Sequence, residues 1–262
     1  MMEEITMNEK LFNINLIKYE IRNLMGNIFT IIFGLVFPIV MSILMSNLIG
    51  GKVPENMRQQ IVTNIFITSS MIIPLATVLV GYSAVFSNEL EKNIPLRFKL
   101  FGYSENSLII SKVFANLFFI TGGLIFYTVV NFLVLDLLIP TAKSAVILII
   151  ALYLLSIILF ILAHGISLIF KKFGITYAIT MTIYFGIMIL SGLFGIQAKE
   201  FPPVLRKVAY TLPTTYIGNE FIDFWSGGVY NFVPFIQSLI FFASVSGIVL
   251  FFAVAYNSRK IK

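Results

Sequence analysis

Six long apolar runs, separated by short polar breaks, dominate the sequence. About 20 mostly apolar residues are enough to cross the hydrocarbon core of a bilayer as an α-helix. The composition agrees, because 58% of the residues are hydrophobic and 11% are charged, whereas a typical soluble domain has about 25% charged residues. We therefore predict an all-α, polytopic membrane protein. It forms a single transmembrane domain over residues 1–262, with spans at residues 28–49, 61–86, 107–138, 144–170, 175–196 and 232–256.

The distribution of Lys and Arg between the predicted spans indicates how the chain crosses the membrane. With an inside amino terminus, 12 of the 18 basic residues lie in cytosolic segments and the other 6 lie in outer segments. The positive-inside rule favours this orientation. The usage of Ile, Asn and Lys suggests an AT-rich bacterial genome. We therefore expect a multi-pass protein of a bacterial plasma membrane with both termini in the cytosol.

Two segments on the cytosolic side have patterns of their own. Within residues 8–25, apolar residues from Leu11 to Leu24 recur at steps of three or four with polar residues between them. This pattern is typical of an amphipathic helix in the membrane interface, here an elbow before the first span. Residues 87–106 mix charged side chains with apolar and aromatic ones. Such a mixed surface suits the docking of a soluble partner.

The outer segment at residues 197–231 is too regular to be a simple linker. Its apolar residues before Pro213 fall on one helical face. They are Val204, Leu205, Val208, Ala209 and Leu212. We expect a short helix that re-enters the membrane from the outer leaflet.

The sequence contains no recognised motif for enzyme chemistry. Gly51-Lys52 is the best candidate for a phosphate-binding loop, but Ser46 replaces the first Gly and Val53 replaces Ser or Thr. With no Cys and a single His, the chain offers neither a thiolate metal site nor a histidine cluster. Its basic residues are scattered and form no nucleic-acid-binding face. We expect no enzyme activity and no cofactor or metal in this chain, and no nucleic-acid partner.

Polar side chains inside the spans are the candidates for a substrate pathway. An ionisable residue in a span is a functional hypothesis by default, which draws attention to His164. Packing near the inner end of its helix explains this histidine better. The hydroxyl groups of the second and fifth spans could line a pathway, but contacts between helices are their commoner use. The pathway candidates are Thr68, Ser69, Thr77, Thr180, Tyr184 and His164.

The chain resembles the membrane subunits of type-2 ATP-binding-cassette (ABC-2) exporters, which are six-helix permeases that pair with a separate ATPase. The resemblance covers most of the chain. It rests on the amphipathic elbow, on the acidic start of the first cytosolic loop at residues 88–92, and on Ser111-Lys112 at the opening of the third span. The stretch after the fifth span is similar to the family's pattern of Ser-Gly and Pro residues before the last helix. Its residues here are Ser191, Gly192, Pro202, Leu212 and Pro213.

At two places the sequence departs from the family pattern, and these departures bear on which subfamily the chain resembles. Pro202 does not directly follow Phe194, and Ile94-Pro95-Leu96 stands where many members have a Gly-Thr-Leu run.

The resemblance implies a two-subunit permease, identical or paralogous, embedded in membrane lipid and driven by a soluble ABC ATPase that binds ATP and Mg²⁺. The cargo would be a drug, an antimicrobial peptide or a lipid-like molecule. The first cytosolic loop would act as a coupling helix in a groove of the ATPase, although an ordinary solvated loop would have a similar composition. The coupling candidates are Glu89, Glu91, Lys92, Arg97, Phe101, Gly102 and Tyr103.

Two other classes of function stay open. A stand-alone channel or secondary transporter places charges or broken helices near the membrane midplane, and such charges are nearly missing here. A membrane-embedded antibiotic sensor or immunity protein would bind its ligand at the outer segment without transporting it. A tightly associated soluble ATPase would distinguish an exporter subunit from both.

Overall fold

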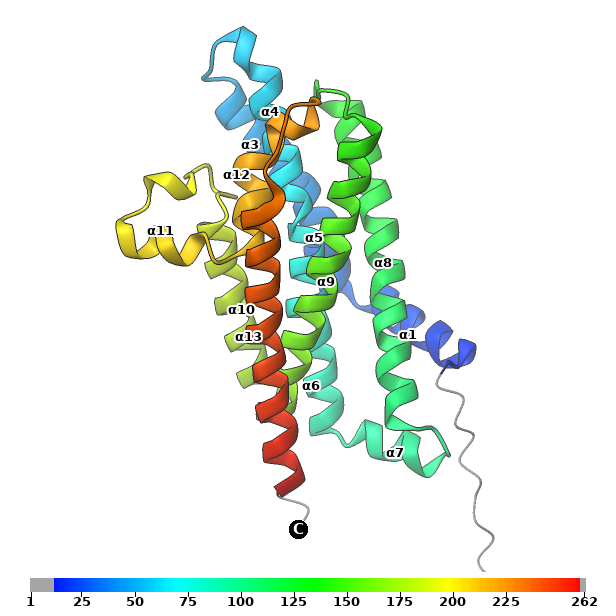
Figure 1. Cartoon of the computed structure of the whole chain (residues 1–262). Coiled ribbons are helices and arrows are strands. Elements are labelled where there is room, and N and C mark those ends of the chain that lie inside the picture. The colour runs from blue at the N-terminus through cyan, green and yellow to red at the C-terminus, as the bar shows by residue number, and fades with distance from the viewer. Residues whose placement is uncertain (1–11, 260–262) are drawn as a thin grey trace, which may run out of the picture.

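The computed structural model describes residues 12–259, which form a bundle of helices joined by short connections (Figure 1). Over this range the chain forms no strand. Six of its helical stretches are long and apolar enough to span a membrane, so the predicted all-α, six-span fold is confirmed. The helical elements are α1 (Ile14–Gly26), α2 (Ile28–Ile31), η1 (Ile32–Val36), α3 (Phe37–Gly50), α4 (Glu55–Ser70), α5 (Ile72–Pro74), η2 (Leu75–Tyr82), α6 (Ser83–Glu91), α7 (Ile94–Leu100), α8 (Glu105–Val134), α9 (Ala142–Phe170), α10 (Phe173–Leu190), η3 (Ala198–Glu200), α11 (Pro203–Ala209), α12 (Pro213–Trp225) and α13 (Phe232–Arg259).

The second span, from Glu55 to Glu91, is the centre of the bundle. Of its most apolar window, 89% is buried inside the protein, against 22% for the first, third and last spans. Pro74 has no backbone N–H to donate, and the eight residues that follow it form a π-helical segment. Local changes of helix type of this kind accommodate the carbonyl groups that a proline leaves free in a membrane.

Helices α9 and α13 pack against each other with close backbones (Figure 1). Gly165 makes this approach possible, because a Cβ atom at this position would lie 3.0 Å from the Cα of Leu250. Small residues at helix contacts commonly have this role in membranes, where close van der Waals packing drives helix association.

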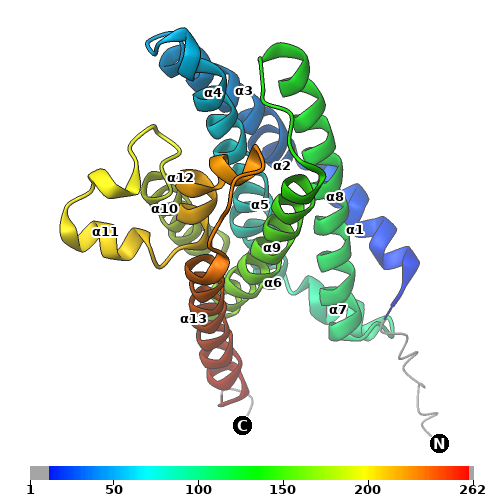
Figure 2. The same cartoon turned by 45° about the horizontal axis from the view of Figure 1, so that its top comes forward.

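Helix α1 lies beside the lower half of α8 and crosses it at an angle (Figures 1 and 2). It begins after Asn13, whose side-chain oxygen accepts hydrogen bonds from the backbone N–H groups of Asn15 and Leu16. One face, including Leu16 and Leu24, is buried. Residues 8–11 of the predicted elbow lie outside the described part of the chain. The amphipathic pattern therefore corresponds to a helix, and its position in the membrane interface stays a prediction.

Two predicted spans are shorter than expected at their carboxyl ends. Helix α8 stops at Val134, and Thr63 Oγ1 accepts a hydrogen bond of 2.9 Å from the backbone N–H of Leu138 in the irregular stretch that follows. Helix α10 stops at Leu190, because the turn that follows places Gly192 at φ +85°, in the left-handed region that favours glycine.

The outer segment contains two α-helices where one was predicted. The predicted helix corresponds to α11, but of its residues only Ala209 is buried. Helix α12 begins at Pro213, and it packs into the bundle against α4, α9 and α13. Its carboxyl end is held by Trp225, whose indole N–H donates to the carbonyl oxygen of Leu138 at 2.8 Å. This second helix therefore closes the bundle at the end opposite α7.

Candidate functional site

A helical corner formed by α6, α7 and α8 lies at the end of the bundle that also holds the carboxyl end of α13 (Figure 1). The chain leaves α6 through Asn93, which has the left-handed φ of 55°. Pro95 occupies the first turn of α7, where a missing N–H costs no hydrogen bond. Gly102, at φ +85°, reverses the direction of the chain. The Ser104 hydroxyl then accepts a hydrogen bond from the backbone N–H of Ser107, which caps the start of α8. The local sequence thus sets α7 across the end of the bundle.

Three charged side chains, which we call the ion cluster, meet behind this corner. Lys112 Nζ on α8 lies 2.8 Å from Glu20 Oε1 on α1 and 2.8 Å from Glu89 Oε1 on α6. All three residues are buried. Burying charges is costly unless they are paired and hydrogen-bonded, which this geometry provides for both carboxylates. The cluster therefore joins α1, the central span and the third span at one point.

The two sides of α7 differ in what they contact. Phe98 faces the protein, with its ring 5.6 Å from that of Tyr19 on α1 and 5.9 Å from that of Tyr103. In contrast, Leu100 and Phe101 are 78% and 81% exposed. We define the α7 surface as the exposed basic and apolar residues on α7 and next to its ends, which are Lys92, Leu96, Arg97, Lys99, Leu100 and Phe101. Exposed apolar groups rimmed by basic residues mark an interaction surface.

The two acidic coupling candidates differ in exposure, because Glu89 is buried whereas Glu91 is exposed and bonded to the start of α10. Glu89 is buried in the ion cluster. Glu91 Oε2 accepts a hydrogen bond of 2.9 Å from the backbone N–H of Phe173 at the start of α10. The cap residue of α10, Lys172, makes no side-chain hydrogen bond there, so Glu91 supplies the missing acceptor. Gly102 and Tyr103 are half-buried. The exposed members of the predicted set are thus basic or aromatic, apart from Glu91.

The structure does not gather the pathway candidates around one cavity. Thr68 and Ser69 line a cavity of about 170 Å³ beside the turn after α10. Thr77 lies against Gly34, whose added Cβ would be 2.6 Å from the threonine hydroxyl. Thr180 accepts a hydrogen bond of 3.1 Å from the Ser83 hydroxyl and so connects α10 to α6. Tyr184 is also buried, on α10. Contacts between helices account for Thr77 and Thr180.

His164 is part of an aromatic stack inside the bundle. Its Nδ1 shares a hydrogen bond of 2.6 Å with the Tyr82 hydroxyl. Its ring stacks on Phe86 at 4.8 Å between centroids. This environment supports the packing interpretation of the histidine. Within residues 12–259, no group of three His, Cys, Asp or Glu side chains is placed to hold a metal ion.

The residues predicted for the re-entrant segment lie where α10, α11 and α12 meet. The Ser191 hydroxyl donates to Thr214 Oγ1 at 2.6 Å, and Gly192 forms the turn. Pro202 directly precedes α11, Leu212 precedes α12, and Pro213 is the first residue of α12. These residues therefore shape the two-helix connection before the last span.

Two charged residues of the site, Glu20 and Lys112, were not predicted to form an ion pair. Each had a signal in the sequence: Glu20 lies in an amphipathic helix, and Lys112 is a lysine near the start of an apolar span. However, a single charge in an amphipathic helix or near the end of a span is commonly solvated or snorkels to the interface, so it does not by itself indicate an ion pair. Because the two residues are 92 positions apart in the sequence, no local pattern indicates their contact.

Comparison with known proteins gives a family match over most of the chain. A family model described as ABC-2 type transporter matches residues 13–224, a region that includes α1, the helical corner and nearly all of α12. No curated protein matches the sequence significantly.

Proposed function

The chain belongs to the ABC-2 type transporter family, and from this premise we propose that it is the permease subunit of an ATP-driven exporter in a bacterial plasma membrane. Membership of this family implies dimerisation and an ATPase subunit as partner. We propose that the second permease subunit is identical or paralogous, that both termini are cytosolic, and that the partner ATPase binds ATP and Mg²⁺. The proposed cargo is a drug, an antimicrobial peptide or a lipid-like molecule.

The observation that supports this proposal best is the α7 surface. Its apolar residues Leu100 and Phe101 are exposed at the end of the bundle where the proposed topology places the cytosol. Arg97 and its basic neighbours surround them. Interfaces commonly combine an apolar centre with a polar rim, and charges of opposite sign on a partner speed and orient docking. The ATPase groove that fits this surface would therefore have an apolar floor and an acidic rim.

A docking surface can drive transport only if its movement reaches the spans. Helix α7 is joined through short turns to α6, which continues the central second span, and to α8. The ion cluster and the Phe98–Tyr19 contact tie the same corner to α1. A displacement of α7 would thus move three helices together. This connection supports a coupling role for the corner. Glu89 would contribute to coupling through the ion cluster behind the α7 surface, and not by contacting the ATPase itself.

Charge substitution on the α7 surface tests the docking step. Leu100→Glu places a carboxylate at the proposed apolar centre, and loss of one interface anchor of about 2 kcal/mol lowers affinity by about 30-fold. Arg97→Glu reverses a rim charge and should slow association more than it speeds dissociation. Val204→Glu is the matched control, because Val204 is 74% exposed on α11, a helix of the same length as α7. Binding of the purified soluble ATPase to immobilised, detergent-solubilised permease measures all three variants.

The expected result is that Leu100→Glu loses ATPase binding while Val204→Glu retains it, with both variants inserted in the membrane at wild-type levels. Equal ATPase binding by Leu100→Glu and wild type would contradict docking at α7. Reconstitution tests the class of transporter: cargo movement in proteoliposomes should require both ATPase and ATP. Movement without ATP would instead indicate a channel or secondary transporter.

A further inference from the structure

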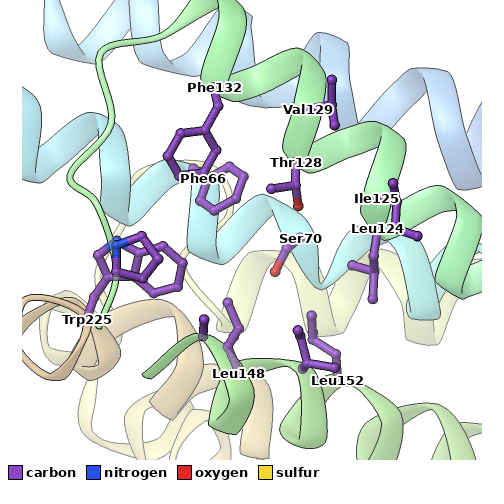
Figure 3. A pocket seen from close by; sticks show the side chains of 13 residues that line it. Phe66, Ser70, Leu124, Ile125, Thr128, Val129, Phe132, Leu148, Leu152 and Trp225 are labelled. Carbon is purple, nitrogen blue, oxygen red and sulfur yellow. The ribbon is translucent and has the colours of Figure 1, made fainter. Parts of the chain in front are cut away.

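A cavity of about 340 Å³ lies between α4, α8, α9 and α12 (Figure 3). Phe66 and Trp225 form one end of it, and Leu148 and Leu152 line it from α9 (Figure 3). Its size falls within the range of about 300–1,000 Å³ that is usual for ligand pockets. Phe66 also packs against the side chain behind it, because its ring stacks on that of Tyr127 at 5.2 Å between centroids.

The cavity opens sideways, toward the surface of the spans. Ile125, Val129 and Ile149 line it, and their side chains are 61%, 51% and 48% exposed. Ile125 and Val129 belong to α8 and Ile149 belongs to α9, so the opening lies between these two membrane-spanning helices. In a membrane this surface faces hydrocarbon.

The walls of the cavity offer few polar groups to which a ligand could bind. The Ser70 hydroxyl donates to the carbonyl oxygen of Ile67 at 2.6 Å, and the Trp225 indole N–H donates to that of Leu138 at 2.8 Å. Thr128 carries the one other side-chain hydroxyl among the lining residues. A ligand that fits these walls is therefore a hydrocarbon, held by dispersion and not by hydrogen bonds.

The length of the cavity matches one leaflet of a bilayer. On α8 it extends from Leu124 to Phe132, which at 1.5 Å per residue is about 12 Å. Half of a hydrocarbon core of about 30 Å is about 15 Å. These residues lie in the half of α8 remote from α7 (Figure 1). Lys143 lies in the sequence between the lining residues Pro140 and Ala145, is exposed, and has its Nζ 5.8 Å from the centroid of the Phe224 ring, one residue before the lining residue Trp225.

We propose that this cavity binds one acyl chain of a phospholipid from the leaflet opposite α7. A concave slot that opens to hydrocarbon gains dispersion contacts when a flexible chain enters it, and it loses them if it stays empty. The inference does not depend on the proposed transport function, since it concerns the walls of the cavity and the leaflet it faces.

Photolabelling of the full-length protein in nanodiscs tests the site. The probe is phosphatidylglycerol with a diazirine in the middle of one acyl chain, and labelled residues are mapped by mass spectrometry. General lipid contact should follow exposure, so the face of α13 with Phe251 and Phe252, 69% and 64% exposed, should then be labelled at least as much as Ile125 and Val129. A binding site should instead enrich label at residues 124–132 and 145–152 by about tenfold per residue over this face, which corresponds to about 1.4 kcal/mol.

A filled-cavity variant provides the second arm. Ala145→Trp places an indole in the cavity and should lower the labelling of residues 124–132 and 145–152 by about tenfold. The control is Val146→Trp, because Val146 is the next residue of α9, is 54% exposed and does not line the cavity. If Ala145→Trp fails to insert, Thr128→Trp fills the same cavity from α8. Labelling that follows exposure alone, survives both filling substitutions, or is replaced by crosslinks to a second copy of the chain would overturn the proposal.

Discussion

Removal of the Lys112 side-chain charge is the sharpest test of the packing behind the α7 corner. Lys112 Nζ is 2.8 Å from one carboxylate oxygen of Glu20 and 2.8 Å from one of Glu89, so these two oxygens are at most 5.6 Å apart. Lys112→Met keeps much of the side-chain volume and removes the cation. Two buried carboxylates then face each other without a partner.

The size of the loss follows from this geometry. At 5.6 Å and an effective dielectric constant of about 20, two like charges repel by about 3 kcal/mol. Breaking a buried ion pair by removing one partner costs about 3–5 kcal/mol in general. Glu89→Gln should cost much less, about 1 kcal/mol, because it leaves a balanced pair between Lys112 and Glu20. The triple variant Lys112→Met, Glu20→Gln, Glu89→Gln should recover most of the loss, since no uncompensated charge remains.

Thermal unfolding of the purified protein measures these differences. The protein has one tryptophan, and Trp225 is buried, so its fluorescence reports unfolding. A loss of 3–5 kcal/mol lowers the midpoint by about 10 °C in a chain of this size. A midpoint for Lys112→Met within about 2 °C of wild type, which is under 1 kcal/mol, would refute the reasoning. So would a loss for Glu89→Gln as large as that for Lys112→Met.

Two further predictions concern the interior of the bundle. Tyr82→Phe removes the hydrogen-bond partner of His164 Nδ1 and should lower the free energy of unfolding by about 1–3 kcal/mol, whereas adding His164→Leu should restore part of it; unchanged stability in Tyr82→Phe would contradict a structural role for this bond. Gly165→Ala places a Cβ 3.0 Å from the Leu250 backbone and should destabilise by about 1–3 kcal/mol. Gly186→Ala is the control, because its Cβ meets nothing within 4 Å and alanine is the better helix former by about 0.5–1 kcal/mol. Unfolding midpoints that rank the two alanine variants in the reverse order would show that α9 and α13 are not closely packed.

The features that the sequence predicts well are those that depend on local pattern. Apolar length alone places the six spans, because a helix that faces lipid must be apolar over the thickness of the membrane. The steps of three or four in the elbow region likewise correspond to the helix α1. The helix expected in residues 87–106 came from the resemblance to ABC-2 permeases, and the structure has α7 there, which begins one residue before Pro95.

The features that the sequence does not predict depend on contacts between distant residues. Lys112 and Glu20 form a pair only because α1 crosses α8, and no local pattern encodes that crossing. Helix α12 was overlooked because its residues were interpreted as connection, although Pro213 at its first position is a usual helix start. The cavity between α8 and α9 depends on how the two helices diverge, which is a property of the packed bundle.

The central claim is that a soluble ATPase docks on α7, and site-specific photocrosslinking tests it most directly. A photoreactive phenylalanine analogue replaces Phe101, which is 81% exposed, in permease expressed with its native partners, and the same analogue replaces Val204 as the control. The account predicts a crosslinked product at position 101 that contains a nucleotide-binding ATPase, and no such product at position 204. An ATPase crosslinked at neither position, or at position 204 in place of 101, would contradict it.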